Sequence, residues 1–305
     1  MPRQKRMASE DAPVNPRTKR LKRADADSPK LNDEAPADLD AERNAEENGD
    51  TVAHTISESI AEKLLSIEKQ LSAEVQRITF QSVVRYIYNP LEYAFDPHAM
   101  YVRKYCNGPK KVIFLGINPG PWGMSQTGVP FGEVTMVRDW LKISGSVGTP
   151  PKEHPDRKIT GFQCRRSEPS GRRLWGLFKK LCGSPENFFQ NAYVHNYCPL
   201  AFLNDRACNV TPAELKGEGI QLLHRICDKA LVDVVRLLNA EFIVGIGKYA
   251  ETRAQLALKT RNLNVKVMYL PHPSPRAAGN TNWDEKAMQQ LNELKLEKFF
   301  ETVNI

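Results

Sequence analysis

The sequence predicts an α/β fold in three layers, α/β/α, with a central, mostly parallel four-stranded sheet. Four short apolar or β-branched runs are typical of buried strands, and segments with helical spacing of apolar residues lie between them. Strands that alternate with helices favour a parallel sheet covered on both faces. Because ligands bind beyond the carboxyl ends of such strands, functional residues are expected directly after each strand.

The elements can be assigned in chain order. Apolar residues recur at helical spacing from Ile56 to Leu71, which predicts an amphipathic helix. The predicted strands are Val112–Ile117, Ala192–Asn196, Phe242–Ile246 and Val265–Leu270, and the predicted helices among them are Leu174–Cys182, Ala213–Asn239 and Ala250–Leu258. No internal repeat is visible, so we expect one folded domain over residues 53–305.

Residues 1–52 differ in composition from the rest of the chain. They are rich in Pro, Ala, Asp, Glu and Lys and contain almost no large apolar residues, so we expect a disordered tail. The basic cluster at 16–23 (PRTKRLKR) predicts nuclear import, and its alternative interpretation is a solvated charge run. The first residues have no apolar segment of a secretory signal, and no stretch is long and apolar enough to cross a membrane.

The charge is distributed unevenly. The first fifty residues hold ten basic and twelve acidic side chains, so the rest of this chain of net charge +7 carries +9. A basic folded domain favours a polyanionic partner such as nucleic acid. The six cysteines form no C-x-x-C pair or tight Cys/His cluster, so we expect reduced thiols and neither metal nor cofactor.

The first predicted strand leads into a rigid loop. Two prolines and two glycines follow Asn118 before Met124 is reached. Glycine lets a backbone approach a ligand closely, and proline fixes the path of the loop. We therefore expect Asn118 to be held at the end of its strand with its amide facing the crevice. Its carbonyl can accept a hydrogen bond from water and orient it, although Asn cannot act as a strong base.

Two further polar residues lie at the ends of predicted strands. His272 stands between prolines after the last strand, and Asn196 ends the second strand. A parallel sheet would bring both to the same edge as Asn118. A lone histidine is more often structural, and an Asn at a strand end is often a turn cap, so position alone does not assign a function.

Together these segments resemble the uracil-DNA glycosylase superfamily, and most closely its single-strand-selective monofunctional branch. The matching motifs are GINPGPWGM at 116–124 with its continuation SQTGVPFGE at 125–133, VHN at 194–196, and HPSPR at 272–276. The resemblance extends from about Tyr86 to Leu294. Ile117 and Trp122 stand where the branch usually has Met and commonly Phe, and the residues after Arg276 also depart from its pattern.

The resemblance implies hydrolysis of the N-glycosidic bond of a uracil that is flipped out of the DNA. Asn118 would position the attacking water. His272 would donate a hydrogen bond to O2 of the base as negative charge collects there. No lysine stands in either motif core, which argues against a Schiff base and for a monofunctional enzyme that leaves an abasic site.

The resemblance also implies a base pocket. Phe131 would stack on the flipped base, Asn196 would bind its O4 and N3 edge, and the backbone of Ile117 would add a hydrogen bond. Gly120 and Met124 would shape the space around C5. The family accepts oxidised C5-substituted uracils such as 5-hydroxymethyluracil and rejects thymine.

Two segments are expected to contact DNA, Arg206–Ile220 and His272–Trp283, and the second would enter the duplex as a wedge. The candidate DNA-binding residues are Arg206, Asn209, Thr211, Lys248, Ser274, Pro275 and Arg276. Lys248 follows a GIG sequence. The backbone amides of this sequence and the charge of Lys248 would bind a phosphate, or the segment would form only a tight strand-to-helix turn.

The expected partner is DNA, both single- and double-stranded. We expect a monomer that acts in the nucleus and initiates base-excision repair. Downstream enzymes would then process the abasic site that it leaves. Two alternatives remain: a mismatch-specific thymine/uracil glycosylase of the same fold, and a non-catalytic DNA-binding module. The presence of both Asn118 and His272 argues against the second, because binding alone would not require both.

Overall fold

The computed structural model describes residues 58–276 and 280–300. Its main sheet has the order β3-β2-β6-β7, and all three pairings are parallel. The strands are β2 (Val112–Gly116), β3 (Ala192–Asn196), β6 (Phe242–Ile246) and β7 (Lys266–Leu270). The four predicted strands are therefore confirmed, with differences of one residue at two ends. Gly116 pairs with Asn196, so β2 and β3 end side by side.

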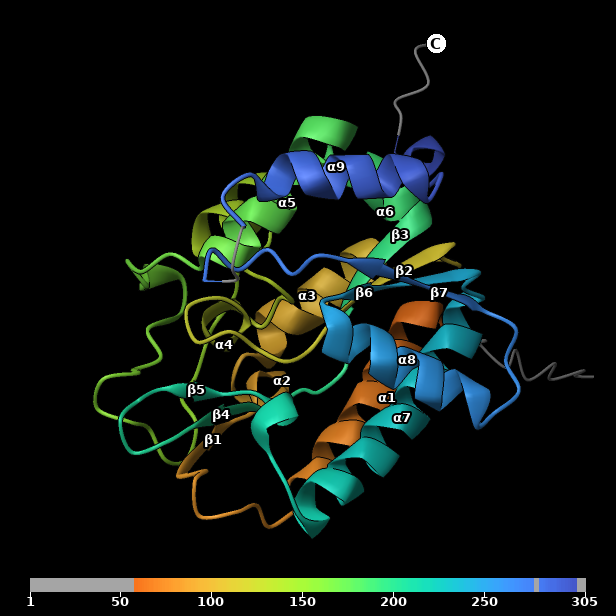
Figure 1. Cartoon of the computed structure of the whole chain (residues 1–305). Helices are drawn as coiled ribbons and strands as arrows, with labels where there is room; N and C mark the ends of the chain where they lie inside the picture. Colours follow the sequence, from red (N-terminus) through yellow and green to blue (C-terminus); the bar gives the residue numbers. More distant parts are fainter. Residues whose placement is uncertain (1–57, 277–279, 301–305) are drawn as a thin grey trace, which may run out of the picture. The chain divides into compact units, whose positions relative to one another are not determined.

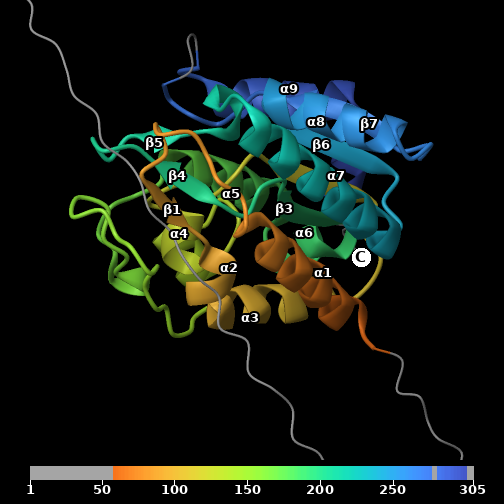
Figure 2. The same ribbon diagram turned by 90° about the horizontal axis from the view of Figure 1, so that it is seen from below.

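Helices cover both faces of this sheet, which confirms the predicted three layers (Figure 1). One face carries α5 (Pro169–Cys182), α6 (Pro185–Asn191) and α9 (Trp283–Glu293). The other face carries α1 (Ile60–Val75), α7 (Glu218–Leu238) and α8 (Lys248–Lys259). Figure 2 shows α1 and α7 running together on the near side, and α3 (Phe95–Tyr105) packs against α1.

The helix boundaries follow from local chemistry. The side chain of Ser59 accepts a hydrogen bond from the backbone of Glu62, so α1 begins at Ile60. The predicted start of this helix, Ile56, lies outside the described residues. α7 begins later than Ala213, because Pro212–Glu214 forms a 3₁₀ turn and Gly217 then takes a left-handed φ of 82°.

A second, antiparallel sheet was not predicted from the sequence. It has the order β1-β4-β5 and consists of β1 (Tyr86–Tyr88), β4 (Ala201–Leu203) and β5 (Asn209–Val210). The remaining short turns are α2 (Pro90–Tyr93), α4 (Met124–Thr127), a π-helical turn at Met136–Trp140, and 3₁₀ turns at Gly161–Gln163 and Glu297–Phe299. Strands of two or three residues are too short for an alternation pattern to reveal them.

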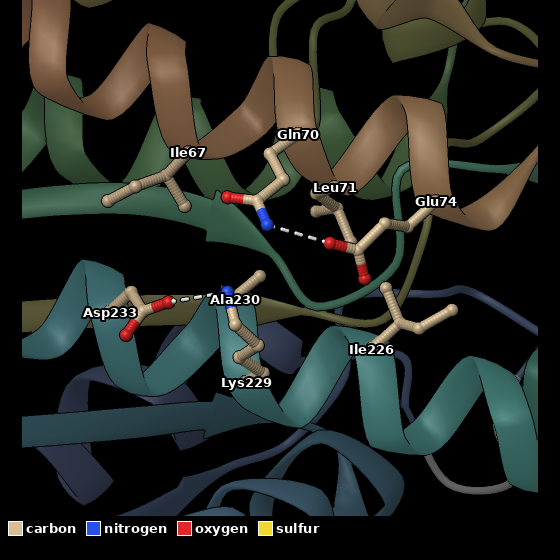
Figure 3. Close-up of a pocket in the computed structure, with 8 residues that line it drawn as sticks. All are labelled: Ile67, Gln70, Leu71, Glu74, Ile226, Lys229, Ala230 and Asp233. Atoms are coloured by element: carbon tan, nitrogen blue, oxygen red, sulfur yellow. Dashed lines mark hydrogen bonds and ion pairs between the residues drawn. The ribbon is translucent and has the colours of Figure 1, made fainter.

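The seam between α1 and α7 contains a small hollow, shown in Figure 3. Its volume is about 10 Å³, which is room for one water molecule at most. Gln70 donates to Glu74 and Lys229 pairs with Asp233, each within its own helix. This hollow is therefore a feature of helix packing. No described helix is long and apolar enough to span a bilayer.

Candidate active site

A cavity of about 440 Å³ lies at the carboxyl ends of β2, β3 and β7, within the usual size range of ligand pockets. Every predicted base-pocket residue lines it: Ile117, Asn118, Gly120, Met124, Phe131, Asn196 and His272. The predicted DNA contacts Asn209, Thr211, Ser274, Pro275 and Arg276 line it as well. The sheet thus brings together side chains that are separated by more than 150 positions in the sequence.

Asn118 is half-buried, and its amide has one fixed partner. Nδ2 donates to the backbone carbonyl of Leu200 at 3.0 Å, on the connection between β3 and β4. Because this bond takes up a donor, it orients the amide and leaves Oδ1 as the group offered to a ligand. The side chain is therefore set to accept a hydrogen bond.

His272 is set in the opposite sense. Its Nδ1 lies 3.1 Å from the backbone N–H of Ser274, which donates to it. A neutral ring with that acceptor carries its proton on Nε2. Burial lowers the pKa of His272 to about 4, so the ring is neutral at physiological pH. His272 thus presents a neutral Nε2–H donor, 6.1 Å from the ring of Phe131 between centroids.

The loop that carries His272 is held by one side chain from α5 and one from the segment before α9. Prolines lack an N–H group, so this loop cannot join a regular backbone ladder. Asn280 donates to the carbonyls of His272 at 2.9 Å and Ser274 at 2.7 Å. Arg173 of α5 donates to the carbonyls of Pro273 at 3.3 Å and Asn280 at 3.0 Å. The position of His272 therefore depends on the packing of α5 and on the segment before α9.

The predicted wedge segment is too long at its far end. Trp283 is only 1% exposed, begins α9, and donates from Nε1 to the carbonyl of Pro271 at 2.7 Å. It belongs to the core and cannot insert into DNA. Pro275 and Arg276 are exposed and line the cavity, so the part of this segment that can meet a duplex lies closer to His272.

Phe131 and Asn196 meet over Gly116, which explains the glycine there. A Cβ atom on Gly116 would collide with Oδ1 of Asn196 and would lie 2.6 Å from the Phe131 ring. Nδ2 of Asn196 donates to the sulfur of Met124 at 3.1 Å, while its buried Oδ1 has no hydrogen-bond partner among the described residues. A buried amide oxygen without a partner is costly, so this atom is suited to accept an N–H group from a ligand.

Glu168 is a site residue that the sequence did not indicate. It precedes α5, and its carboxylate accepts the backbone N–H of Trp122 at 3.2 Å. A Cβ atom on Gly120 would lie 2.6 Å from Oε2, and one on Gly123 would lie 3.0 Å from Cγ. The glycines of the first motif therefore make room for Glu168. Burial raises the pKa of this carboxyl, and the charge of Arg276 partly offsets that rise.

The remaining predicted DNA contacts have different surroundings. Arg206 is exposed in the turn between β4 and β5, outside the cavity lining. Asn209 is exposed at the rim, whereas the hydroxyl of Thr211 donates at 2.7 Å to the glutamate of its own capping box. Lys248 forms an ion pair with Glu251 at 2.7 Å and does not line the cavity. The structure does not bring Arg206 or Lys248 to the cavity.

The fold and the paired Asn and His at one sheet edge define the class of protein. The chain belongs to the uracil DNA glycosylase superfamily, whose model matches residues 103–295. It is 50% identical over 233 residues to the single-strand selective monofunctional uracil DNA glycosylase of Bos taurus, covering 76% of this chain and 86% of the relative. The protein of the same name from Mus musculus is 51% identical, with coverage of 76% and 84%.

A solved structure supports the fold. The crystal structure of wild-type SMUG2 from Pedobacter heparinus superposes with a TM-score of 0.56 at 18% identity, covering 78% of this chain and 99% of that chain. These comparisons confirm the resemblance seen in the motifs and the α/β fold class.

Proposed function

We propose that this chain is a monofunctional DNA glycosylase that hydrolyses the N-glycosidic bond of uracil in DNA and so initiates base-excision repair. One observation carries the proposal: an oriented acceptor, Asn118, and an oriented neutral donor, His272, line one cavity from separate strand ends. Relatives about half identical over most of their length carry the corresponding name.

The two side chains match the two charges that develop as the bond breaks. The bond between C1′ of the sugar and N1 of uracil breaks, and its electron pair leaves with the base. Oδ1 of Asn118 orients a water whose oxygen bonds to C1′ and whose proton passes to solvent. Nε2–H of His272 donates a hydrogen bond to O2 of the departing anion, a preorganised contact of the kind that dominates many enzymatic rate enhancements.

Recognition of the base falls to the side chains over Gly116. The free Oδ1 of Asn196 would accept N3–H of uracil, and its Nδ2 would turn from the Met124 sulfur toward O4. Phe131 would stack on the ring, and the backbone of Ile117 would contribute a further bond. Gly120 and Met124 would leave space beside C5 for the hydroxymethyl group of 5-hydroxymethyluracil.

The cleavage is proposed to be monofunctional. Among the described residues that line the cavity there is no lysine, so an amine nucleophile is not at hand. We propose that the chain acts as a monomer on single- and double-stranded DNA. We propose a nuclear location from the basic cluster at 16–23, and transfer of the abasic product to downstream repair enzymes.

A single-turnover assay tests this proposal. Oligonucleotides with one uracil or one 5-hydroxymethyluracil are incubated as single strands and as duplexes. An oligonucleotide with one thymine opposite guanine is incubated as a duplex. We expect uracil and 5-hydroxymethyluracil to be released, with strand breaks only after alkali. Rapid release of thymine would instead indicate the mismatch-specific alternative, and absence of any release would indicate a binding module.

A further inference from the structure

The rim of the cavity carries an arginine–tryptophan cluster, formed by Trp122, Arg157 and Arg166. Each of the two guanidinium groups lies 4.8 Å from the centroid of the Trp122 ring. Trp122 and Arg157 also line the cavity that holds Asn118 and His272, and Arg166 is exposed beside them. The cluster is therefore continuous with the base pocket and open to solvent.

Among the described residues, no carboxylate forms an ion pair with the two arginines of this cluster, Arg157 and Arg166. Arg157 donates from Nη1 to the backbone carbonyl of Asp156 at 3.1 Å, and its buried Nε has no hydrogen-bond partner among the described residues. Two like charges held at one ring repel each other unless an anion lies between or beside them. The arrangement is suited to bind an anion.

Stacking also selects the kind of anion. A guanidinium group that lies over an aromatic ring can still donate N–H groups in its own plane, and two such groups match two oxygens of a phosphate. A base in the cavity stays attached to its strand, so the neighbouring phosphates must cross the rim. We propose that Arg157 and Arg166, stacked on Trp122, bind the backbone phosphates next to the flipped nucleotide. This inference rests on the proposed function.

The cluster is coupled to the reaction site through Trp122. The backbone N–H of Trp122 is held by Glu168, and Trp122 lies four positions after Asn118 on the same rigid loop. A phosphate bound to the cluster is therefore placed relative to the water-orienting amide. Phosphate contacts of this kind fix the register of the strand and carry no base specificity.

Binding measured over a series of salt concentrations tests the inference. The probe is a fluorescent single-stranded oligonucleotide with one 2′-fluoro-2′-deoxyuridine, whose fluorine slows cleavage. The logarithm of the binding constant should fall less steeply with the logarithm of salt in the variants, by about 0.7 for each lost single-strand phosphate contact. We expect the magnitude of this slope to decrease by about 0.7 for Arg166→Ala and by about 1.4 for Arg157→Ala combined with Arg166→Ala.

Three comparisons make the test specific. Arg165→Ala removes the same charge from an exposed neighbour outside the cluster and should leave the slope and uracil release unchanged. Trp122→Phe should keep most of the binding, while Trp122→Ala, with its fold checked by circular dichroism, should lose as much as the double variant. Equal slopes in wild type and double variant, or equal losses for Arg165→Ala and Arg166→Ala, would overturn the inference. Failure of the wild type to release uracil would refute the proposed function instead.

Discussion

At the scale of single residues, hydrogen-bond partners decide what Asn118 and His272 offer to a substrate. Either side chain can donate and accept in isolation. The carbonyl of Leu200 takes up an N–H of Asn118, and the backbone N–H of Ser274 takes up a lone pair of His272. One side chain is left as an acceptor and the other as a donor. In the proposed reaction the acceptor would orient water and the donor would stabilise the leaving base, so their opposite polarities would match the opposite charges that develop as the bond breaks.

His272 yields a prediction about pH. Its pKa is lowered to about 4 by burial, so the donor form should persist as pH falls from 8 through the usual range of histidine titration. Single-turnover uracil release should therefore show no inflection near pH 6.5, where unperturbed histidine titrates. Release should decline only as pH approaches about 4, when protonation breaks the bond from Ser274.

The control for this measurement is His272→Ala, which should release uracil about a hundredfold more slowly. An inflection near neutrality that is present in wild type and absent from this variant would show that His272 acts in its charged form. Asn118→Ala, with the histidine intact, should also be slower by about a hundredfold or more and should retain the wild-type pH profile.

Arg276 yields a prediction about substrate strandedness. It is exposed, lines the cavity, and lies close enough to Glu168 for its charge to offset part of the rise that burial causes in the pKa of that carboxyl. Arg276→Ala should slow release from duplex DNA more than from single strands, because only a duplex must be unstacked and unpaired. Rates on matched substrates give the answer. An equal fractional loss on both would mean that Arg276 acts through Glu168 and the motif loop.

Residues at strand ends could be placed in the cavity from the sequence, whereas residues placed there by tertiary packing could not. The positions of Asn118, Asn196 and His272 could be predicted because each lies at or just after the carboxyl end of a strand, where a parallel sheet gathers polar groups. Glu168 could not be predicted from the sequence, because it reaches the site only through the packing of α5 and no spacing pattern marks it. Trp283 was wrongly included in the predicted wedge segment, because a tryptophan beside a predicted DNA-binding loop has no local feature that distinguishes a core residue from a wedge.

At the scale of elements, the loop after β7 is positioned by other segments. Asn280 bonds two of its carbonyls, and Arg173 of α5 bonds a third. Asn280→Ala would leave those carbonyls without their side-chain donor and let His272 shift. We expect uracil release to slow by about ten- to a hundredfold, since small misplacements of reacting groups are costly.

Single-turnover rates with circular dichroism test this role of Asn280. Asn292→Ala, an exposed change on α9, provides the control and should leave the rate unchanged. Asn280→Ala should retain the pH profile of the wild type, because the bond from Ser274 to His272 remains possible. A normal rate in Asn280→Ala would show that the prolines hold the loop without this side chain.

A buried ion pair ties α1 and α3 to the first motif. Nε2 of His98 lies 2.7 Å from Oε2 of Glu68, and Nδ1 lies 2.8 Å from the carbonyl of Gly128. Both partners are acceptors, so the ring must carry both protons. Burial alone would lower the pKa of His98, but the charge of Glu68 and the bond to it outweigh burial and raise it. Burial would raise the pKa of Glu68, and His98 in turn holds it low.

These opposite shifts predict how stability depends on pH. The contribution of His98 is lost as pH rises through its raised folded pKa, and that of Glu68 is lost as pH falls through its lowered folded pKa. The free energy of unfolding should therefore be greatest between these limits. Glu68→Gln should cost about 3–5 kcal/mol, because it leaves the charge of His98 buried alone.

Urea unfolding across pH measures this effect. Glu62→Gln on the same helix is the matched control: its exposed pair with Arg103 should contribute little to stability. If Glu68→Gln were as mild as Glu62→Gln, the buried pair would be neutral and His98 uncharged.

At the scale of the whole molecule, burial determined what the sequence could reveal. The four strands of the main sheet were predicted nearly to the residue because each contains a short apolar or β-branched run, and the two central strands, β2 and β6, are almost entirely buried beneath helices. The helix α9 escaped prediction because only Trp283, Ala287 and Leu291 are buried, one side chain per turn. The small sheet escaped because its strands are shorter than one period of any recognisable pattern.

The last prediction separates the folded domain from the first fifty residues. The described residues that line the cavity fall between Ile117 and Arg276, whereas the basic cluster at 16–23 lies outside the described part of the chain. Deletion of residues 1–50 removes ten basic and twelve acidic side chains, so it hardly changes net charge. We therefore expect uracil release from a short oligonucleotide to stay within about twofold of wild type, because counterion release depends on phosphate contacts and not on distant balanced charge.

Nuclear accumulation of a fluorescent fusion should fall, and replacing only the five Lys and Arg of 16–23 by Ala in the full chain should reproduce that fall. A large loss of release by the deleted chain would show that the tail contributes to the reaction itself, and undiminished nuclear accumulation of both forms would remove the case for an import sequence.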